Sequence, residues 1–177
     1  MVHFILVNTY FDNNEHQNCW SNMAFVRTIQ EFKRNLAARF SSNIWLGTID
    51  FSKWAIVGGC VLNALCRSPF PDTKQQDINL VYHINDISDF KKSIDIIVDK
   101  LNQIFSQNLH NEIKVERIAG TPDYNVFLPD HAQLNFTWKP IGNSKYPLSH
   151  ILHNFDMDIC QIAFVGKSVH ILITYSY

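Results

Sequence analysis

The spacing of apolar residues predicts two amphipathic helices. In the first, apolar residues recur three or four positions apart, at Phe25, Ile29, Phe32, Leu36 and Phe40. Because one helical turn takes 3.6 residues, this spacing places an apolar stripe along a helix of about residues 19–40. A second, clearer stripe predicts a helix preceded by Ser88 and Asp89, which could cap it. This stripe consists of Ile94, Ile97, Val98, Leu101, Ile104 and Phe105.

Short apolar runs bounded by turn residues predict strands. Residues 54–57 are apolar throughout, and residues 61–66 beyond a pair of glycines are expected to form a short helix. Between residues 77 and 82 polar and apolar positions alternate, which indicates a strand with one apolar face. The remaining expected strands are residues 113–118, 124–128, 133–138, 155–165 and 168–175, and residues 147–152 are expected to form a brief helix.

The order of these elements predicts the fold class. A helix, a strand, a short helix, a strand, a long helix and then several strands indicate an α+β or mixed α/β fold. The two prolines of residues 68–73 favour a loop between the short helix and the strand that follows it. The length of 177 residues suits one domain spanning residues 1–177.

Composition and charge narrow the classes of partner. The chain is 46% apolar and 18% charged, with a net charge of −1, so it has no general electrostatic attraction to nucleic acid or to an anionic membrane. The four cysteines form no CxxC pair, and the N-terminus lacks the basic region and cleavage site of a secretion signal. No segment is long and apolar enough to span a bilayer. The chain is therefore expected to be intracellular, in the cytoplasm.

A pair of glycines and a pair of polar residues could form a ligand site. Gly58 and Gly59 stand between the apolar run 54–57 and the short helix. Glycine lets the backbone approach a phosphate closely, and the N-terminus of the following helix favours negative charge. Asp77 and Asn79 occupy alternate positions of the next strand, so both side chains project from one face and could hold a metal ion between them.

This pattern resembles the signature of the polymerase-β-like nucleotidyltransferase fold, and the resemblance covers about residues 50–165. It implies a mixed sheet flanked by helices and a site for a nucleoside triphosphate, such as ATP, with Mg²⁺ or Mn²⁺. The glycine pair and Cys60 would cradle the triphosphate. Asp77 would be catalytic and would hold metal together with Asn79. The nucleotide would be transferred to a hydroxyl group of an acceptor that the sequence does not identify.

The third acidic position that the resemblance implies has two candidate sources in the sequence. Asp156 and Asp158 share one face of a predicted strand, and either could orient or deprotonate the attacking hydroxyl. Asp158 is slightly favoured and would also hold metal. Alternatively, the strand of residues 133–136 supplies this position, which then carries Asn135 instead of an acid.

Several residues depart from the pattern of an active nucleotidyltransferase. The family normally has a carboxylate at the position of Asn79, and an amide lacks the charge that Mg²⁺ prefers in its ligands. The gap between Gly59 and Asp77 is longer than usual, and Lys74 is the nearest basic residue to the motif. Three interpretations therefore remain. One is an active metal-dependent transferase, and another is an inactive relative that serves as a binding module or contacts a protein partner. A structural protein that shares only the topology is a third.

Three other patterns favour ordinary structural roles. His150 and His153 are three residues apart, but no further spaced Cys or His completes a metal site. Residues 165–168 have the sequence Val-Gly-Lys-Ser, and a hairpin turn explains them better than a phosphate-binding loop. Four aromatic residues that look exposed could stack on bases, but in a chain with 13% aromatic residues most aromatic side chains must belong to the core. These four are Trp138, Tyr146, Tyr175 and Tyr177.

Overall fold

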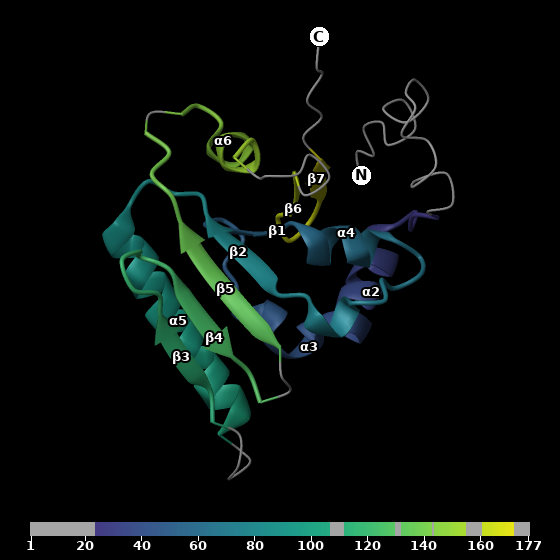
Figure 1. Ribbon diagram of the computed structural model, residues 1–177, viewed down its shortest axis with the longest axis horizontal. Coiled ribbons are helices and arrows are strands. Elements are labelled where there is room, and N and C mark those ends of the chain that lie inside the picture. The colour runs from purple at the N-terminus through teal and green to yellow at the C-terminus, as the bar shows by residue number, and fades with distance from the viewer. Residues whose placement is uncertain (1–23, 107–111, 130–131, 143, 155–160, 172–177) are drawn as a thin grey trace.

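A mixed sheet of seven strands forms the centre of the computed structural model, in the order β3-β4-β5-β2-β1-β6-β7 (Figure 1). The structure describes residues 24–106, 112–129, 132–142, 144–154 and 161–171. The strands are β1 (Trp54–Val57), β2 (Ile78–Tyr82), β3 (Lys114–Arg117), β4 (Tyr124–Phe127), β5 (Gln133–Trp138), β6 (Ile162–Phe164) and β7 (Val169–Ile171). The helices are α2 (Ile29–Phe40), α3 (Ser42–Trp45), α4 (Gly59–Leu65), α5 (Ile87–Phe105) and α6 (Pro147–Leu152). The expected α+β class is confirmed.

The pairing of the strands brings distant parts of the chain together. β2 and β5 run parallel, whereas every other neighbouring pair is antiparallel. A parallel pair requires a long crossover connection, and here α5, β3 and β4 fill it. The crossover places the middle of the chain beside β2, so the residues of β5 lie next to the predicted ligand strand.

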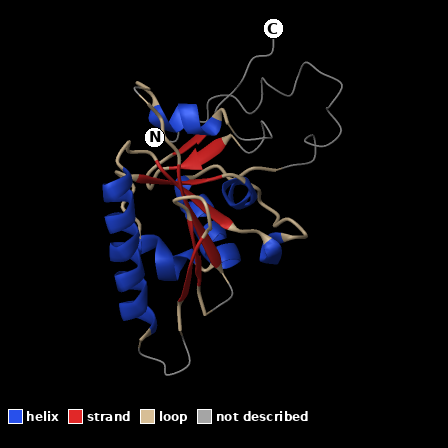
Figure 2. Ribbon diagram, turned by 60° about the vertical axis from the view of Figure 1, so that its left-hand side comes forward, coloured by secondary structure: helices blue, strands red, loops and turns tan. Residues whose placement is uncertain are grey.

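The sheet has a main core on one face and a smaller one on the other. Figure 2 shows the strands nearly edge-on, with the long helix α5 along one side. On the main face, Phe32 of α2 and Phe90 of α5 pack in one cluster with Trp54 and Leu80 of the sheet. On the opposite face, α6 packs over β1, β2 and β6. That second cluster consists of Ala55, Val57, Val81, Ile141, Ile151, Leu152 and Ala163.

The first predicted helix starts later than its apolar spacing indicated. α2 begins at Ile29, because Thr28 and Glu31 form a capping box in which each side chain accepts a hydrogen bond from the other's backbone N–H. Residues 24–26 are extended instead and pair with the end of α4: the N–H of Val26 donates to the carbonyl of Leu65 at 2.8 Å. Residues 19–23 lie outside the described residues.

The long helix is confirmed, but its cap differs from the prediction. Asp86, and not Ser88 or Asp89, is the N-cap of α5. The Oδ1 of Asp86 accepts hydrogen bonds from the backbone N–H groups of Ser88 at 2.8 Å and of Asp89 at 3.0 Å. Four residues of the stripe are buried as expected: Ile94, Ile97, Leu101 and Phe105. Val98 is partly buried against the main core, and Ile104 is 43% exposed near the end of the helix. The predicted turn at residues 165–168 is also present, as the connection between β6 and β7.

Candidate functional site

The two polar residues of the predicted ligand strand lie together with an asparagine of β5. Asp77 immediately precedes β2, and Asn79 lies within it. The parallel register pairs Asn79 with Asn135 of β5. Paired residues of neighbouring strands project from the same face of a sheet, so these three side chains meet on one face. The face is opposite to that of the neighbouring Ile78 and Leu80, which are buried in the main core.

A hydrogen-bonded network joins these side chains. The Nδ2 of Asn135 donates to Oδ2 of Asp77 at 3.2 Å and to Oδ1 of Asn79 at 3.1 Å. The Oδ1 of Asn135 in turn accepts a hydrogen bond from Nε2 of Gln133 at 2.7 Å. Both donor hydrogens of the Asn135 amide, and one acceptor position of its oxygen, are therefore used within the cluster.

The glycine turn lies beside this cluster. The register pairs Val57, the last residue of β1, with Asn79, so the turn that follows β1 comes close to the polar cluster. Gly58 has φ 81° and ψ −148°, a conformation that residues with a Cβ adopt only at a cost. Its N–H donates to the carbonyl of Ile162 at 3.1 Å. The turn is thus fixed against β6, and the backbone N–H of Gly58 is already used.

Cys60 presents no side chain to a ligand. It is 1% exposed, and its Sγ lies 3.7 Å from the carbonyl oxygen of Val57. Burial raises the pKa of the Cys60 thiol to about 12, although the neighbouring N–H groups of Asn79 and Val61 act in the opposite direction. Cys60 is therefore a neutral, buried thiol, and only its backbone could contact a phosphate.

The lengthened connection between the glycines and Asp77 has its own anchor. Asn63 of α4 is fully buried, and its Nδ2 donates to Oγ1 of Thr73 at 2.8 Å and to Oε1 of Gln76 at 3.0 Å. The second contact fixes the residue immediately before Asp77. Lys74, the basic residue expected near the motif, is exposed on the 3-10 turn Thr73–Gln75, whose first residue is buried.

The C-terminal end of α4 is held by α2. Arg39 Nη1 donates to the carbonyl oxygens of Asn63 and Cys66, and to the side-chain oxygen of Asn63 at 3.1 Å. Asn35 Nδ2 donates to the carbonyls of Ala64 and Cys66, each at 3.0 Å. The last carbonyls of a helix need partners from outside it, and a cation there is favoured by the helix dipole. α2 thereby fixes α4, which carries the glycine turn at its other end.

The amide row extends beyond the cluster. Asn125 of β4 pairs with Asn135 across the antiparallel register, and Glu116 of β3 pairs with Asn125. Asn79, Asn135 and Asn125 therefore form a row across three adjacent strands, and all three are partly exposed. The alternation of polar residues in each strand was visible in the sequence, but the order β4-β5-β2 that aligns them was not.

The donor set of this cluster does not fit a centre for two divalent cations. Such a centre relies on several carboxylates, whereas the cluster supplies one carboxylate, from Asp77, and the amides of Asn79 and Asn135. Within the described residues, no group of three or more His, Cys, Asp or Glu side chains is arranged to hold a metal. His150 and His153 belong to this described part. Asp156 and Asp158, the predicted third acids, lie outside it, and their role stays a prediction.

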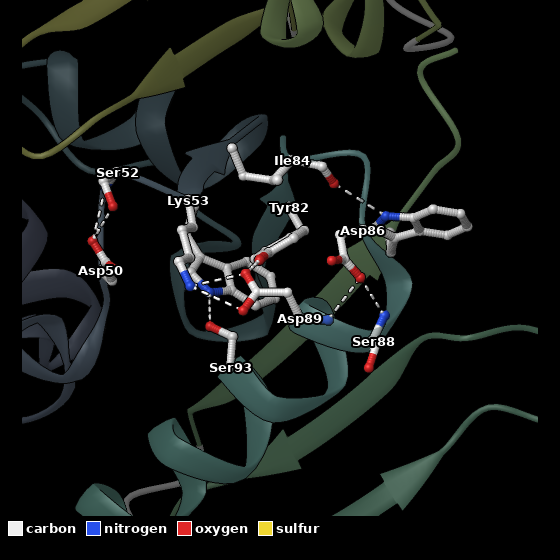
Figure 3. A network of polar contacts seen from close by, with 11 residues as sticks. Asp50, Ser52, Lys53, Tyr82, Ile84, Asp86, Ser88, Asp89 and Ser93 are labelled. Atoms are coloured by element: carbon white, nitrogen blue, oxygen red, sulfur yellow. Dashed lines mark hydrogen bonds and ion pairs between the residues drawn. The ribbon is translucent and has the colours of Figure 1, made fainter.

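A second polar network occupies the other end of β2 (Figure 3). Lys53 forms an ion pair with Asp89 at 2.8 Å, and the hydroxyl of Tyr82 donates to the same carboxylate. The hydrogen bond from Lys53 is the main cause that lowers the pKa of Asp89, and burial is the main cause that raises the pKa of Tyr82. The nearby Trp54 donates from Nε1 to Oγ of Ser93 at 2.7 Å. This network connects β1 and β2 to α5. No motif in the sequence predicted it.

The predicted stacking aromatics differ in their placement. Trp138 is partly buried and donates from Nε1 to the carbonyl of Ile84 at 3.3 Å, whereas Tyr146 is 66% exposed. Tyr175 and Tyr177 lie outside the described residues. Across the described segments, none of the helices has the combination of length and apolar composition that crossing a bilayer requires.

Among known proteins, solved structures are similar to this chain. No protein-family model matches it, and no curated protein does. It is similar to the Thermotoga maritima CCA-adding enzyme complexed with tRNA, with 15% identity over 80% of this chain and a TM-score of 0.48. It is also similar to a CCA-adding enzyme in complex with CTP (13% identity, 75% of this chain, TM-score 0.48) and to a tRNA nucleotidyltransferase complexed with a primer tRNA and an incoming ATP analog (17%, 65%, 0.41). The chain spans 30%, 30% and 28% of the lengths of these three proteins.

Proposed function

We propose that this chain is a nucleotidyltransferase-fold domain that does not transfer nucleotides and serves as a binding module. The observation that carries the proposal is the Asn135 amide, which donates to both Asp77 and Asn79. In the expected enzyme these positions would be acidic and would bind cations. Here two of the three side chains, Asn79 and Asn135, are neutral.

The chemistry of transfer explains why the neutral side chains matter. A nucleotidyl transfer needs positive charge near the triphosphate and an activated hydroxyl, and in two-metal sites the cations supply both. Within the described cluster, Asp77 is the one side chain that provides a negative charge for holding them. The Asn135 amide turns donor hydrogens, not lone pairs, toward Asp77 and Asn79. Loss of charge at such positions removes several kcal/mol of transition-state stabilisation, on the order of a 10³-fold loss of rate or more.

A nucleoside triphosphate is the ligand class that the neighbouring backbone favours. Gly58, at φ 81°, lies directly before α4 and directly after Val57, the register partner of Asn79. Such a turn lets a phosphate approach the backbone closely. The alternative, a transferase that uses Mg²⁺ or Mn²⁺ with Asp158 or Asp156 as the third acid, remains the competing function.

The test separates binding from transfer. The purified chain is incubated with each of the four NTPs and with Mg²⁺ or Mn²⁺, with total RNA and total protein as acceptors, and pyrophosphate release is measured. In parallel, calorimetry measures the binding of each NTP without added metal. Asp77→Asn is the matched control for the first measurement, because it removes the only carboxylate of the cluster without changing its shape.

The proposal expects pyrophosphate release no greater than that of Asp77→Asn, together with measurable binding of at least one NTP that Gly58→Ala weakens. Release that depends on Asp77 would establish the transferase instead. Failure of all four NTPs to bind would exclude the nucleotide as the ligand of the module.

A further inference from the structure

The Asn135 amide nitrogen stands where two oxygen ligands converge. Oδ2 of Asp77 and Oδ1 of Asn79 lie at nearly equal distances from it, 3.2 and 3.1 Å. Two oxygens at alternate positions of one strand converge in this way when they share a cation. Here the amide NH₂ group of Asn135, from the neighbouring strand β5, lies where these two oxygens converge.

The Asp77 carboxylate fixes the orientation of the Asn135 amide, and a third contact completes it. Gln133 lies two residues earlier on β5 and donates from Nε2 to Oδ1 of Asn135 at 2.7 Å. The Asp77 carboxylate offers only acceptors, so the reverse orientation of the Asn135 amide would set an amide oxygen against it, which is repulsive. The Gln133 amide can turn to suit either orientation, so its contact completes the arrangement without deciding it. The Asp77 carboxylate therefore keeps the donor hydrogens of Asn135 directed at Asp77 and Asn79.

We propose that the Asn135 carboxamide acts as a built-in substitute for a cation and closes the position between Asp77 and Asn79 to metal ions. The two hydrogens of the amide carry partial positive charge and satisfy one oxygen each. The parallel junction of β2 and β5 is thereby joined without a metal. A divalent ion would have to break both hydrogen bonds and would then gain only one charged ligand.

The Asn135 amide excludes metal in addition to the missing negative charge at Asn79. Changing Asn79 alone to a carboxylate leaves the Asn135 amide in place, with a stronger acceptor beside it. Metal binding therefore requires a change at position 135 as well. This claim concerns metal alone and does not depend on nucleotide binding, so it can fail or succeed separately from the proposed function.

The experiment titrates the full chain and its variants with Mn²⁺ and follows the electron paramagnetic resonance signal of the free ion. The test variant is Asn79→Asp/Asn135→Asp. The matched control is Asn79→Asp/Asn125→Asp, which adds the same charge on the same face, one strand further from Asp77, and keeps the Asn135 amide. Circular dichroism checks that each variant is folded.

The expected result is saturable binding of Mn²⁺ to the test variant, at least about tenfold tighter than to the parent chain or the control, because ligand charge sets the affinity of such sites. The melting temperature of the test variant should also rise with Mn²⁺. Equal Mn²⁺ binding by the test variant and its control would overturn the proposal, as would tight binding by the parent chain that Asp77→Asn abolishes. If the double variant does not fold, Asn135→Asp alone undergoes the same titration, with Asn125→Asp as its control and the same expected contrast.

Discussion

Gly58 and Gly59 are adjacent, but only the backbone conformation of Gly58 disfavours a residue with a Cβ. Gly58 adopts φ 81°, whereas Gly59 begins α4, and a Cβ added there would meet nothing within 4 Å. Gly58→Ala should therefore lower the free energy of unfolding by about 1–3 kcal/mol. Gly59→Ala should leave it unchanged or raise it by up to about 1 kcal/mol. Urea denaturation of both variants measures the contrast, and equal losses would contradict the special role of Gly58.

Cys60 gives the fold a dependence on alkaline pH. Burial raises the pKa of its thiol to about 12, whereas an unfolded cysteine titrates near about 8.5. Below about pH 8.5 the thiol keeps its proton in both the folded and the unfolded state. Above that pH only the unfolded state releases the proton, so the free energy of unfolding falls by up to about 1.4 kcal/mol per pH unit. Urea denaturation at pH 7 and pH 10 should show a smaller loss for Cys60→Ala than for the parent chain. The same loss in both would refute this assignment.

At the scale of elements, α4 depends on its capping by α2. Arg39 donates to carbonyls at the C-terminal end of α4, at Asn63 and Cys66. Hydrogen bonds from a charged group contribute about 1.5–3 kcal/mol, so Arg39→Ala should lower the free energy of unfolding by about 2 kcal/mol. Arg34 lies on the same helix and is exposed, and Arg34→Ala should change it by less than about 0.5 kcal/mol. Chemical denaturation compares the two, and similar losses would argue against the capping role.

The boundaries of elements were harder to predict than their existence. The apolar spacing placed the first helix correctly at its C-terminal end, but Phe25 extended the stripe by chance into a segment that pairs with residues 65–67. The signal that could have corrected this was Thr28 followed three residues later by Glu31, a capping box. For α5, Asp86 was the cap, and Asp89 was held by Lys53 instead. A local pattern cannot reveal such a distant partner.

At the scale of the whole molecule, the sequence predicted the parts of the site but not their assembly. Each strand and the glycine turn followed from local patterns, because apolar alternation and turn residues act over a few positions. The position of Asn135 beside Asn79 depended on which strand lies next to β2. That pairing joins residues more than fifty positions apart, and only the sheet order shows it. The departure at Asn79 was visible in the sequence, whereas the bridging amide was not.

The central claim is that the Asn135 amide closes the position between Asp77 and Asn79 at which a cation would bind. Crystals of the parent chain soaked with Mn²⁺ and ATP, and measured by anomalous diffraction, test it most directly. The account predicts no Mn²⁺ peak in direct contact with Asp77, and an Asn135 amide still within hydrogen-bonding distance of Asp77 and Asn79. A Mn²⁺ ion bound to both Asp77 and Asn79, with Asn135 displaced, would contradict it.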